Sequence, residues 1–447
     1  MAPSFELMAP IMFGALIVVL LFGYPVAFSL AAIGLGFGAI AIELGYFQLA
    51  LLQALPERVY GIASNQLLLS IPFFTFMGAI LERCGLAEDL LDTMGQLFGP
   101  LRGGLAYAVI LVGALLGAIT GTVAASVIAM GLISLPVMTR YGYDPKLATG
   151  VIAASGTITQ IIPPSLVLVV LADAMGKSVG DMYAGAFIPS FILVGLFCLY
   201  IFVLTLFRPD LAPALPIEVR SGSLGQLLIR CMVSMVPSLA LIFMVLGTIL
   251  VGLATPTEGG AMGAVGALAL AIANRRLSLK LLKEAMDMTL KITTMVMFIL
   301  VGSTVFTLVF RGVDGDLWVE GMLSNLPGGV VGFLIFVNVF IFFLAFFLDY
   351  FEIAFIIIPL LAPVAEKMGI DLIWFGVLIG VNMQTSFMHP PFGFALFYLR
   401  SIAPPSIKSS DILLGSIPWV FIMLVMVLLV ILFPQMVSLS VSIFGRF

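Results

Sequence analysis

The sequence contains too few charged residues to cover the surface of a soluble protein. Only 9% of its 447 residues are charged, with 19 Lys and Arg against 23 Asp and Glu, whereas 62% are hydrophobic. Soluble globular chains average about a quarter charged residues. The shortage excludes a soluble enzyme, a nucleic-acid-binding protein and a disordered chain. It leaves an all-α polytopic protein embedded in the lipid bilayer.

Histidine and cysteine are also scarce, which excludes most metal and redox chemistry. The single histidine, His389, rules out metal sites with two or three histidines and haem held by a histidine pair. Cys84, Cys198 and Cys231 stand alone in or near apolar stretches, so we expect neither a disulfide framework nor a metal site. The sequence shows no P-loop and no nucleophile–base set. It therefore predicts neither an enzyme nor a bound cofactor.

Long apolar runs are what the sequence has in abundance. A spanning helix needs about 20 mostly apolar residues, and the candidates are roughly 7–22, 25–43, 65–82, 183–207, 229–253, 258–274, 289–311 and 411–434. Two connectors with mixed polarity, about 47–60 and 279–291, are expected to be helices along the membrane interface. Two further apolar regions, about 103–176 and 328–403, are interrupted by Gly and Pro.

The distribution of basic residues predicts how these runs cross the membrane. Cytoplasmic loops carry an excess of Lys and Arg. If the N-terminus is periplasmic and 105–138 and 330–366 return to their side of origin, 14 of the 19 basic residues lie inside and 5 outside. Treating either region as one crossing removes this bias. The charges therefore predict two re-entrant helical hairpins, one from each face.

The two halves of the chain share one ungapped register. The double proline at 163–164 recurs at 390–391, an offset of 227 residues. Four more positions match at this offset: Pro136 with Pro363, Val137 with Val364, Gly142 with Gly369, and Asp144 with Asp371. The predicted topology puts the matched segments on opposite sides of the membrane. Inverted-topology repeats of this kind are typical of secondary transporters.

We therefore expect a first repeat over 1–220 and a second over 221–447. Each would contain scaffold helices, a hairpin and a helix broken at its double proline. The hairpins are expected at about 103–140 and 328–367, and the broken helices at about 146–176 and 372–403. The scaffold and the transport domain would each draw on both repeats.

The breaks and the hairpin tips carry the candidate ion ligands. A proline interrupts the helical hydrogen bonds, and the carbonyls freed in this way need substitute partners inside a membrane. Such carbonyls, with Ser, Thr, Asn and Asp oxygens, suit a hard cation such as sodium. One predicted sodium site combines Thr120, Gly121, Thr122, Ser155, Gly156 and Thr157, and the other combines Asp349, Asn382, Gln384 and Thr385. Ordinary proline kinks, with hydroxyls bonded to their own backbone, are the alternative.

An anionic substrate is expected between the tips, because the helix N-termini beyond the breaks carry partial positive charge. Asp349 would bind sodium or carry a proton, and Glu352 would bind substrate or form an internal ion pair. His389 would bind substrate or sense pH, or it would be a satisfied buried side chain that caps the break. Asp144 and Asp371 are expected to cap helices. The candidate substrate contacts are Gln160, Pro163, Pro164, Ser165, Glu352, Ser386, His389, Pro390 and Pro391.

At these residues the sequence resembles the large membrane subunit, or M subunit, of tripartite ATP-independent periplasmic (TRAP) transporters. The similar segments are 70–74, 101–106, 117–125, 157–165, 348–364, 374–377 and the Phe392-Gly393 pair after the second double proline. The resemblance implies an elevator-type fold like that of the ion transporter superfamily. It also implies sodium-coupled uptake of an organic anion across the bacterial inner membrane, with sodium ions as the coupling ions.

The resemblance also implies two protein partners, a periplasmic substrate-binding protein (P-type) and a separate small four-helix membrane subunit (Q-type). The second half departs from many family members, which have a less polar second tip and a Thr-Pro-Pro break. Asp349, Glu352 and Met388-His389 look like a branch associated with mannitol, chloroaromatic compounds or 2-oxo acids. This favours a monocarboxylate or 2-oxo acid. A standalone sodium-coupled carrier of dicarboxylates or other anions, and an ion channel, are the alternatives.

Overall fold

The computed structural model describes residues 5–120, 122–220 and 224–445, and the regular elements in these ranges are all helices. Among the described residues, seven helices are long and apolar enough to cross a membrane. They are α2 (Val26–Glu43), α8 (Val123–Arg140), α11 (Val179–Phe207), α12 (Leu224–Leu250), α13 (Pro256–Ala273), α14 (Leu279–Gly312) and α21 (Ser409–Leu432). The multi-pass, all-helical membrane protein expected from the composition is confirmed.

One group of helices packs closely through small residues. Helix α14 lies along α2 and α5 (Ser70–Arg83), and α13 lies along α5. A Cβ at Gly34 of α2 would lie 3.0 Å from backbone atoms of Phe306 in α14. A Cβ at Gly302 of α14 would overlap the carbonyl oxygen of Ala27. Backbones approach this closely only where side chains are small, as is usual between membrane helices.

Two details of the predicted helices are wrong. The connector 279–291 is not a separate interfacial helix, because α14 is one uninterrupted helix of 34 residues that contains no proline. Its start is fixed by Ser278, whose hydroxyl accepts the Leu281 N–H at 3.1 Å. Helix α22 (Gln435–Phe444) was not expected, because its 10 residues are too few for a membrane span.

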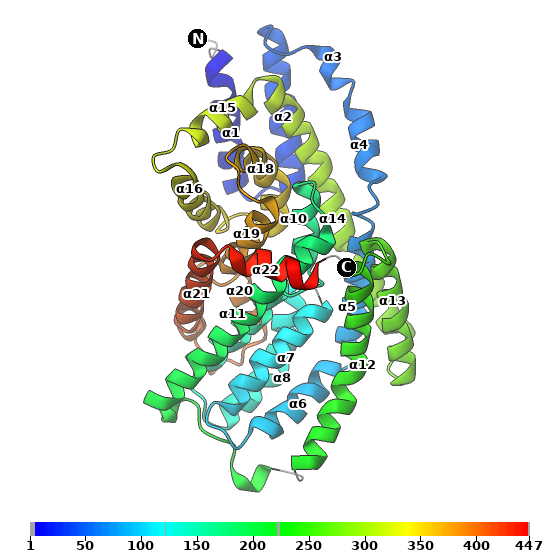
Figure 1. Cartoon of the computed structure of the whole chain (residues 1–447), viewed down its shortest axis with the longest axis vertical. Coiled ribbons are helices and arrows are strands. Elements are labelled where there is room, and N and C mark those ends of the chain that lie inside the picture. Colours follow the sequence, from blue (N-terminus) through cyan, green and yellow to red (C-terminus); the bar gives the residue numbers. More distant parts are fainter. Residues whose placement is uncertain (1–4, 121, 221–223, 446–447) are drawn as a thin grey trace.

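The remaining N-terminal elements follow the predicted runs more closely. Helix α1 (Phe5–Leu21) packs on α2. The connector at 47–60 forms two short helices, α3 (Leu49–Leu52) and α4 (Leu55–Ala63), along the right edge of the molecule in Figure 1. Helix α5 starts at Ser70, later than the predicted 65, and has only 14 residues.

Two helix pairs occupy the regions predicted as hairpins. The first consists of α7 (Gly104–Thr120) and α8. The second consists of α16 (Gly329–Leu344) and a segment made of α17 (Tyr350–Glu352), a π-helical turn and α18 (Ile358–Lys367). Figure 1 shows α7 and α8 in the lower half of the view, and α16 and α18 in the upper half.

Both double prolines interrupt a helix, as the sequence predicts. In the first half, α9 (Pro145–Thr157) is followed by a 3-10 turn, the two prolines and α10 (Leu166–Ala174). In the second half, α19 (Leu372–Ser386) ends before the prolines and α20 (Phe394–Ile402) begins after them. Figure 1 shows α10, α19 and α20 in the centre of the molecule, between the two helix pairs.

Helix starts in the two halves follow the 227-residue offset of the sequence. Helix α8 starts at Val123 and α17 at Tyr350, while α9 starts at Pro145 and α19 at Leu372. The predicted capping role of the preceding aspartates is confirmed. Asp144 accepts the Leu147 N–H at 3.1 Å, and Asp371 accepts the Trp374 N–H at 2.7 Å. Equivalent capping and turn residues therefore start equivalent helices.

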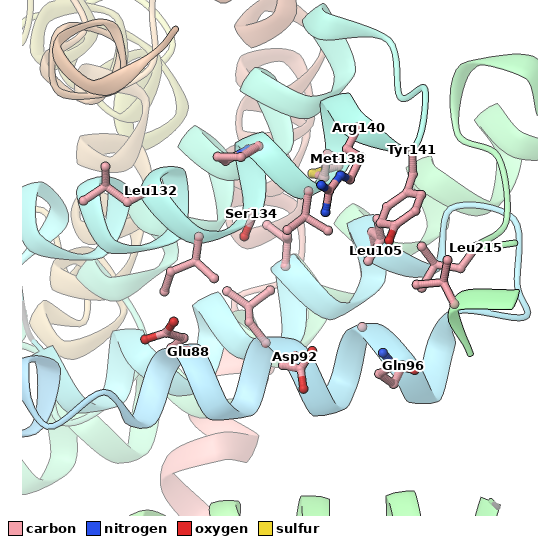
Figure 2. Close-up of a pocket in the computed structure, with 17 residues that line it drawn as sticks. Glu88, Asp92, Gln96, Leu105, Leu132, Ser134, Met138, Arg140, Tyr141 and Leu215 are labelled. Atoms are coloured by element: carbon pink, nitrogen blue, oxygen red, sulfur yellow. The ribbon is translucent and has the colours of Figure 1, made fainter. Parts of the chain in front are cut away.

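A cavity of about 1060 Å³ lies beside the first helix pair. Its walls are α8 and the amphipathic helix α6 (Leu86–Phe98), with α7 contributing Leu105. Figure 2 shows Glu88 and Asp92 on the α6 wall, and Ser134 and Arg140 on the α8 wall. The cavity therefore separates charged groups of opposite sign that belong to two different helices.

Candidate functional site

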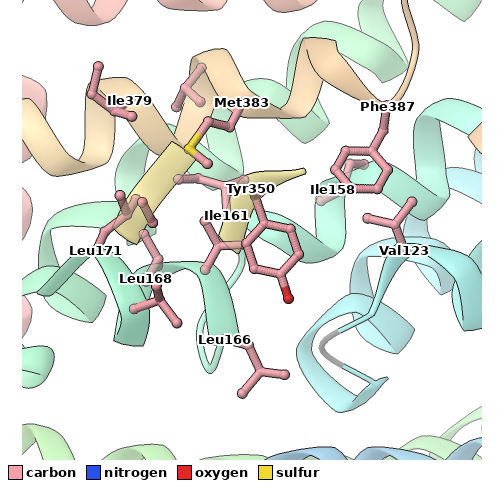
Figure 3. Packing of buried hydrophobic residues seen from close by; sticks show 14 of the residues in the cluster. Val123, Ile158, Ile161, Leu166, Leu168, Leu171, Tyr350, Ile379, Met383 and Phe387 are labelled. Carbon is pink, nitrogen blue, oxygen red and sulfur yellow. The ribbon is translucent and has the colours of Figure 1, made fainter. Parts of the chain in front are cut away.

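The two tips and the two breaks meet in one buried apolar cluster (Figure 3). Val123 and Tyr350 start the second helix of each pair, and Figure 3 shows them close to Ile161 of the first break and Met383 and Phe387 of the second. The rings of Tyr350 and Phe387 lie 6.4 Å apart. Apolar residues next in sequence to the predicted ion ligands of both halves therefore belong to one cluster, although they are far apart in the sequence.

At the first tip, Thr122 offers a free oxygen. It occupies the N-cap position of α8 with an extended backbone (φ −128°, ψ 130°), and its side chain caps nothing. Its hydroxyl oxygen is buried and has no hydrogen-bond partner within the described chain. Gly121 and the side chain of Thr120, the other two ligands predicted here, lie outside the described residues.

At the first break, two predicted hydroxyl ligands bond to their own helix. The Ser155 hydroxyl donates to the carbonyl of Ile152 at 2.9 Å, and the Thr157 hydroxyl donates to the carbonyl of Ala154 at 2.8 Å. Both side chains are fully buried. A hydroxyl that donates its proton keeps lone pairs on its oxygen. These contacts thus fit both the kink alternative and a cation site.

Glycines allow the first helix pair to pack closely against this break. A Cβ at Gly156 of α9 would overlap Val127 of α8. A Cβ at Gly117 of α7 would lie 2.9 Å from the Cα of Thr159. Thr159 is fully buried, and its hydroxyl has no hydrogen-bond partner among the described residues. The predicted ligand set did not include Thr159, although it belongs to the same polar stretch.

At the second tip, Asp349 and Glu352 form a capping box. The Asp349 carboxylate accepts the Tyr350 N–H at 2.6 Å, and the Glu352 carboxylate accepts the Asp349 N–H at 2.9 Å. Neither residue forms a salt bridge within the described ranges, so the internal ion pair expected for Glu352 is not found there. Asp349 occupies the N-cap position equivalent to that of Thr122 and retains free oxygen lone pairs.

The second break holds two buried amides and a hydroxyl. The Asn382 amide donates to the backbone carbonyl of Asn338 at 2.8 Å and to its side-chain oxygen at 3.1 Å. The side-chain oxygen of Asn382 and both amide atoms of Gln384 have no partner in the described chain. The Thr385 hydroxyl donates to the Asn382 carbonyl at 2.7 Å. Buried polar atoms are rarely left unpaired, so these point to a site that takes up an ion, water or substrate.

Most of the predicted substrate contacts are buried, whereas Glu352 and Pro390 are half-buried and Pro391 is exposed. Both amide atoms of Gln160 lack a partner among the described residues. Ser165 caps α10, since its hydroxyl accepts the Val167 N–H at 3.1 Å and donates to the Gln160 carbonyl. The Ser386 hydroxyl donates to the carbonyl of Met383. The prolines at 163–164 and 390–391 form the breaks themselves, and both Pro-Pro peptide bonds are cis.

His389 lies in an aromatic pocket at the second break. Its ring stacks on Phe346 with centroids 3.8 Å apart and meets Phe342 edge-on at 5.0 Å. It is 2% exposed, and neither ring nitrogen makes a hydrogen bond within the described chain. Binding of a ligand by His389 and a purely structural role of its buried ring both stay predictions. The nitrogens remain available to a ligand or to water.

The chain matches the family model of the tripartite ATP-independent periplasmic transporter, DctM component, over residues 13–436. It belongs to this family. The permease is 30% identical to the C4-dicarboxylate TRAP transporter large permease protein DctM of Pseudomonas aeruginosa, over 87% of this chain and 89% of that one. It is 26% identical to the 2,3-diketo-L-gulonate TRAP transporter large permease protein YiaN of Escherichia coli, over 87% and 90%. The predicted family is confirmed, and the family is a transporter permease rather than an enzyme.

Two further similarities extend this comparison. The permease is 24% identical to the sialic acid TRAP transporter permease protein SiaT of Haemophilus influenzae, over 86% of this chain and 61% of that longer one. It shares its fold with the Alcanivorax borkumensis YdaH transporter, whose crystal structure matches with a TM-score of 0.60 at 14% identity. That match covers 86% of the permease and 88% of the other chain.

Asn338 is a second functional candidate of the permease, after Thr159, that sequence reasoning missed. It lies on α16, is 7% exposed, and bonds to Asn382 of the second break. The available signal was an amide in the middle of the apolar run 329–344, where polar side chains are costly.

Proposed function

We propose that the permease carries out sodium-coupled uptake of an organic anion. The observation that carries this proposal is a set of buried oxygens at both breaks and at the first tip that have no partner among the described residues, in a chain of the TRAP permease family. Oxygen ligands without thiolate are what a hard cation such as sodium prefers. One sodium ion would bind between the first tip and first break, and a second between the second tip and second break.

The proposed substrate is a carboxylate, with a monocarboxylate or 2-oxo acid favoured. The named substrates of the relatives, C4-dicarboxylates, 2,3-diketo-L-gulonate and sialic acid, are all organic acids. The N-termini of α10 and α20 follow the two breaks and suit one carboxylate. The carboxylates of Asp349 and Glu352 repel a second negative charge on the substrate more than they repel one.

The proposed mechanism is an elevator motion of the two helix pairs and broken helices against the scaffold helices. Helices α7 and α16 have 17 and 16 residues. At 1.5 Å per residue they are about 25 Å long, shorter than the roughly 30 Å hydrocarbon core. This supports re-entrant hairpins whose tips end within the membrane. Inverted repeats over 1–220 and 221–447 would place the first pair on the inner side and the N-terminus on the periplasmic side.

The proposed partners are a periplasmic binding protein and a small membrane subunit in the bacterial inner membrane, as membership of the TRAP family implies. Reconstitution into liposomes tests the whole proposal. An inward sodium gradient should drive uptake of the bound acid only when the permease, the small subunit and the loaded binding protein are all present. Uptake by the permease alone would support the standalone carrier, and uptake without sodium would contradict sodium coupling.

A further inference from the structure

The amide of Asn382 is held in one orientation by Asn338. The Asn338 amide nitrogen donates to the Leu334 carbonyl at 2.8 Å, so its own side-chain oxygen faces Asn382. The Asn382 nitrogen then uses both N–H groups, one on the backbone carbonyl of Asn338 and one on that side-chain oxygen. An amide whose nitrogen is bonded in this way must turn its oxygen to the opposite side. That oxygen is buried and has no partner in the described chain.

We propose that Asn338 is a positioning residue that aims the Asn382 oxygen at the cation of the second half. This inference rests on the proposed sodium site. The first half needs no such residue, because Ser155 stands at the position equivalent to Asn382 and its hydroxyl bonds within its own helix. Leu111 stands at the position equivalent to Asn338. The second half thus uses a residue from the hairpin to orient a ligand of the broken helix.

The test compares Asn338→Leu, which introduces the first-half residue, with Asn382→Ala in sodium-dependent uptake. Asn338→Leu should raise the half-saturating sodium concentration about three- to tenfold, and Asn338→Asp, which keeps an acceptor oxygen, should restore part of it. The maximal rate and membrane yield should change less than the sodium affinity. If Asn382→Ala weakens sodium binding and Asn338→Leu does not, the positioning role is wrong. If neither variant changes sodium affinity, the second sodium site itself is wrong.

A second, independent observation is an ion pair that only one half makes. Arg140 ends α8 and Lys367 ends α18, and the two positions are equivalent at the 227-residue offset. Lys367 pairs with Glu320 of α15 (Gly315–Ser324), a helix that packs on α18. Arg140 makes no ion pair with any described residue and instead lines the 1060 Å³ cavity.

The opposite wall of that cavity carries a carboxylate suited to Arg140. Asp92 of α6 and Arg140 of α8 both line this cavity, on opposite walls (Figure 2). Asp92 is adjacent in sequence to the position equivalent to Glu320. Its present partner is Arg230, in a long contact of 3.7 Å with both side chains more than half exposed. Exposed pairs of this kind contribute little to stability. Asp92 is therefore free to exchange partners.

We infer that these two pairs are alternating latches. Glu320–Lys367 closes the second half in the conformation described, and Asp92–Arg140 closes the first half in the opposite one. The inference rests on the proposed elevator motion. In a protein built from two equivalent halves, one half is open while the other is closed, and the motion exchanges their roles. Each latch would stabilise one end of the motion without touching the substrate.

Cysteine cross-linking in membranes tests the exchange without requiring a known substrate. Asp92→Cys and Arg140→Cys form the reporter pair in a chain whose three native cysteines are replaced by alanine. Adding Lys367→Glu should raise the yield of this cross-link at least threefold, and the double exchange Glu320→Lys with Lys367→Glu should reverse the effect. Glu366→Gln is the matched control, because Glu366 pairs with Lys177 instead.

Two outcomes would overturn the latch. One is an Asp92–Arg140 reporter yield that Lys367→Glu leaves unchanged, and the other is an equal rise in the Glu366→Gln control. Neither outcome depends on uptake, so the latch can fail while sodium-driven transport stands. Membrane yield and uptake of each variant distinguish a displaced equilibrium from a misfolded chain.

Discussion

The two halves of the permease begin equivalent helices 227 residues apart, yet they hold them together with different chemistry. In the first half the pair α7–α8 packs on its broken helix through glycine, and the tip ends in the neutral Thr122. In the second half the contact is made by an Asn338–Asn382 amide pair and aromatic rings, and the tip carries Asp349. The repeated turn and proline residues thus set the backbone, while the side chains proposed as ligands differ between the halves.

A substitution in the close packing of the first half should have the largest effect on folding. Gly156→Leu would place the four carbons of a leucine side chain in the space that Val127 occupies. Overpacking a core costs about 1–3 kcal/mol for a few added methylenes. We therefore expect the yield of folded permease in membranes to fall about tenfold and uptake to be lost with it. Gly380→Ala in the second half is the control.

A Cβ at Gly380 would meet its nearest neighbour, Ile161, at an ordinary 3.4 Å, so Gly380→Ala should be tolerated. Size-exclusion chromatography of the detergent-solubilised proteins would measure both variants. Equal behaviour of the two would show that the close packing of the first half is not what holds its hairpin in place.

The charged tip distinguishes the second half most clearly. Asp349→Asn should raise the half-saturating sodium concentration about tenfold or more, because a charged ligand is replaced by a neutral one. Glu352→Gln is the matched control, since glutamine at this position still completes a capping box. Sodium-dependent uptake measures both. If Glu352→Gln lowers the sodium affinity more than Asp349→Asn does, Glu352 and not Asp349 is the sodium ligand of the second half.

Substitution at the neutral tip of the first half should also raise the half-saturating sodium concentration, but less than Asp349→Asn does. Thr122→Ala removes one uncharged ligand, so we expect the half-saturating sodium concentration to rise about three- to tenfold. Thr122→Ser keeps the hydroxyl and should behave like the parent protein. If Thr122→Ala keeps the wild-type sodium affinity, the Thr122 side chain is not a ligand of the first sodium site.

The smallest expected effect on uptake comes from an exposed ion pair at the surface of α18. Lys177 and Glu366 form an exposed ion pair at 3.2 Å, with side chains 35% and 63% exposed. Exposed pairs contribute about 0–1 kcal/mol, so Lys177→Gln should change the uptake rate less than about twofold. A tenfold loss of uptake rate would reveal a role for this pair in joining the α10–α11 connection to α18.

The sequence predicts the parts of the fold that depend on local backbone chemistry. Asp144 and Asp371 were expected to cap helices, and the double prolines to break them, because caps and prolines act on their own neighbours. The sequence did not predict that 279–291 is the first part of α14. A segment of mixed polarity can be a separate interfacial helix or the end of a longer helix, and the polarity does not distinguish the two. Asn338 was not predicted either, because its partner lies 44 residues away and only packing brings them together.

Equilibrium binding of radioactive sodium to the purified permease tests the central claim, one sodium site in each half, most directly. We predict two sites per wild-type chain, with Thr122→Ala and Asp349→Asn each weakening a different one and the double variant weakening both. A wild-type chain that binds no sodium, or single variants that both bind it like the wild type, would contradict the account.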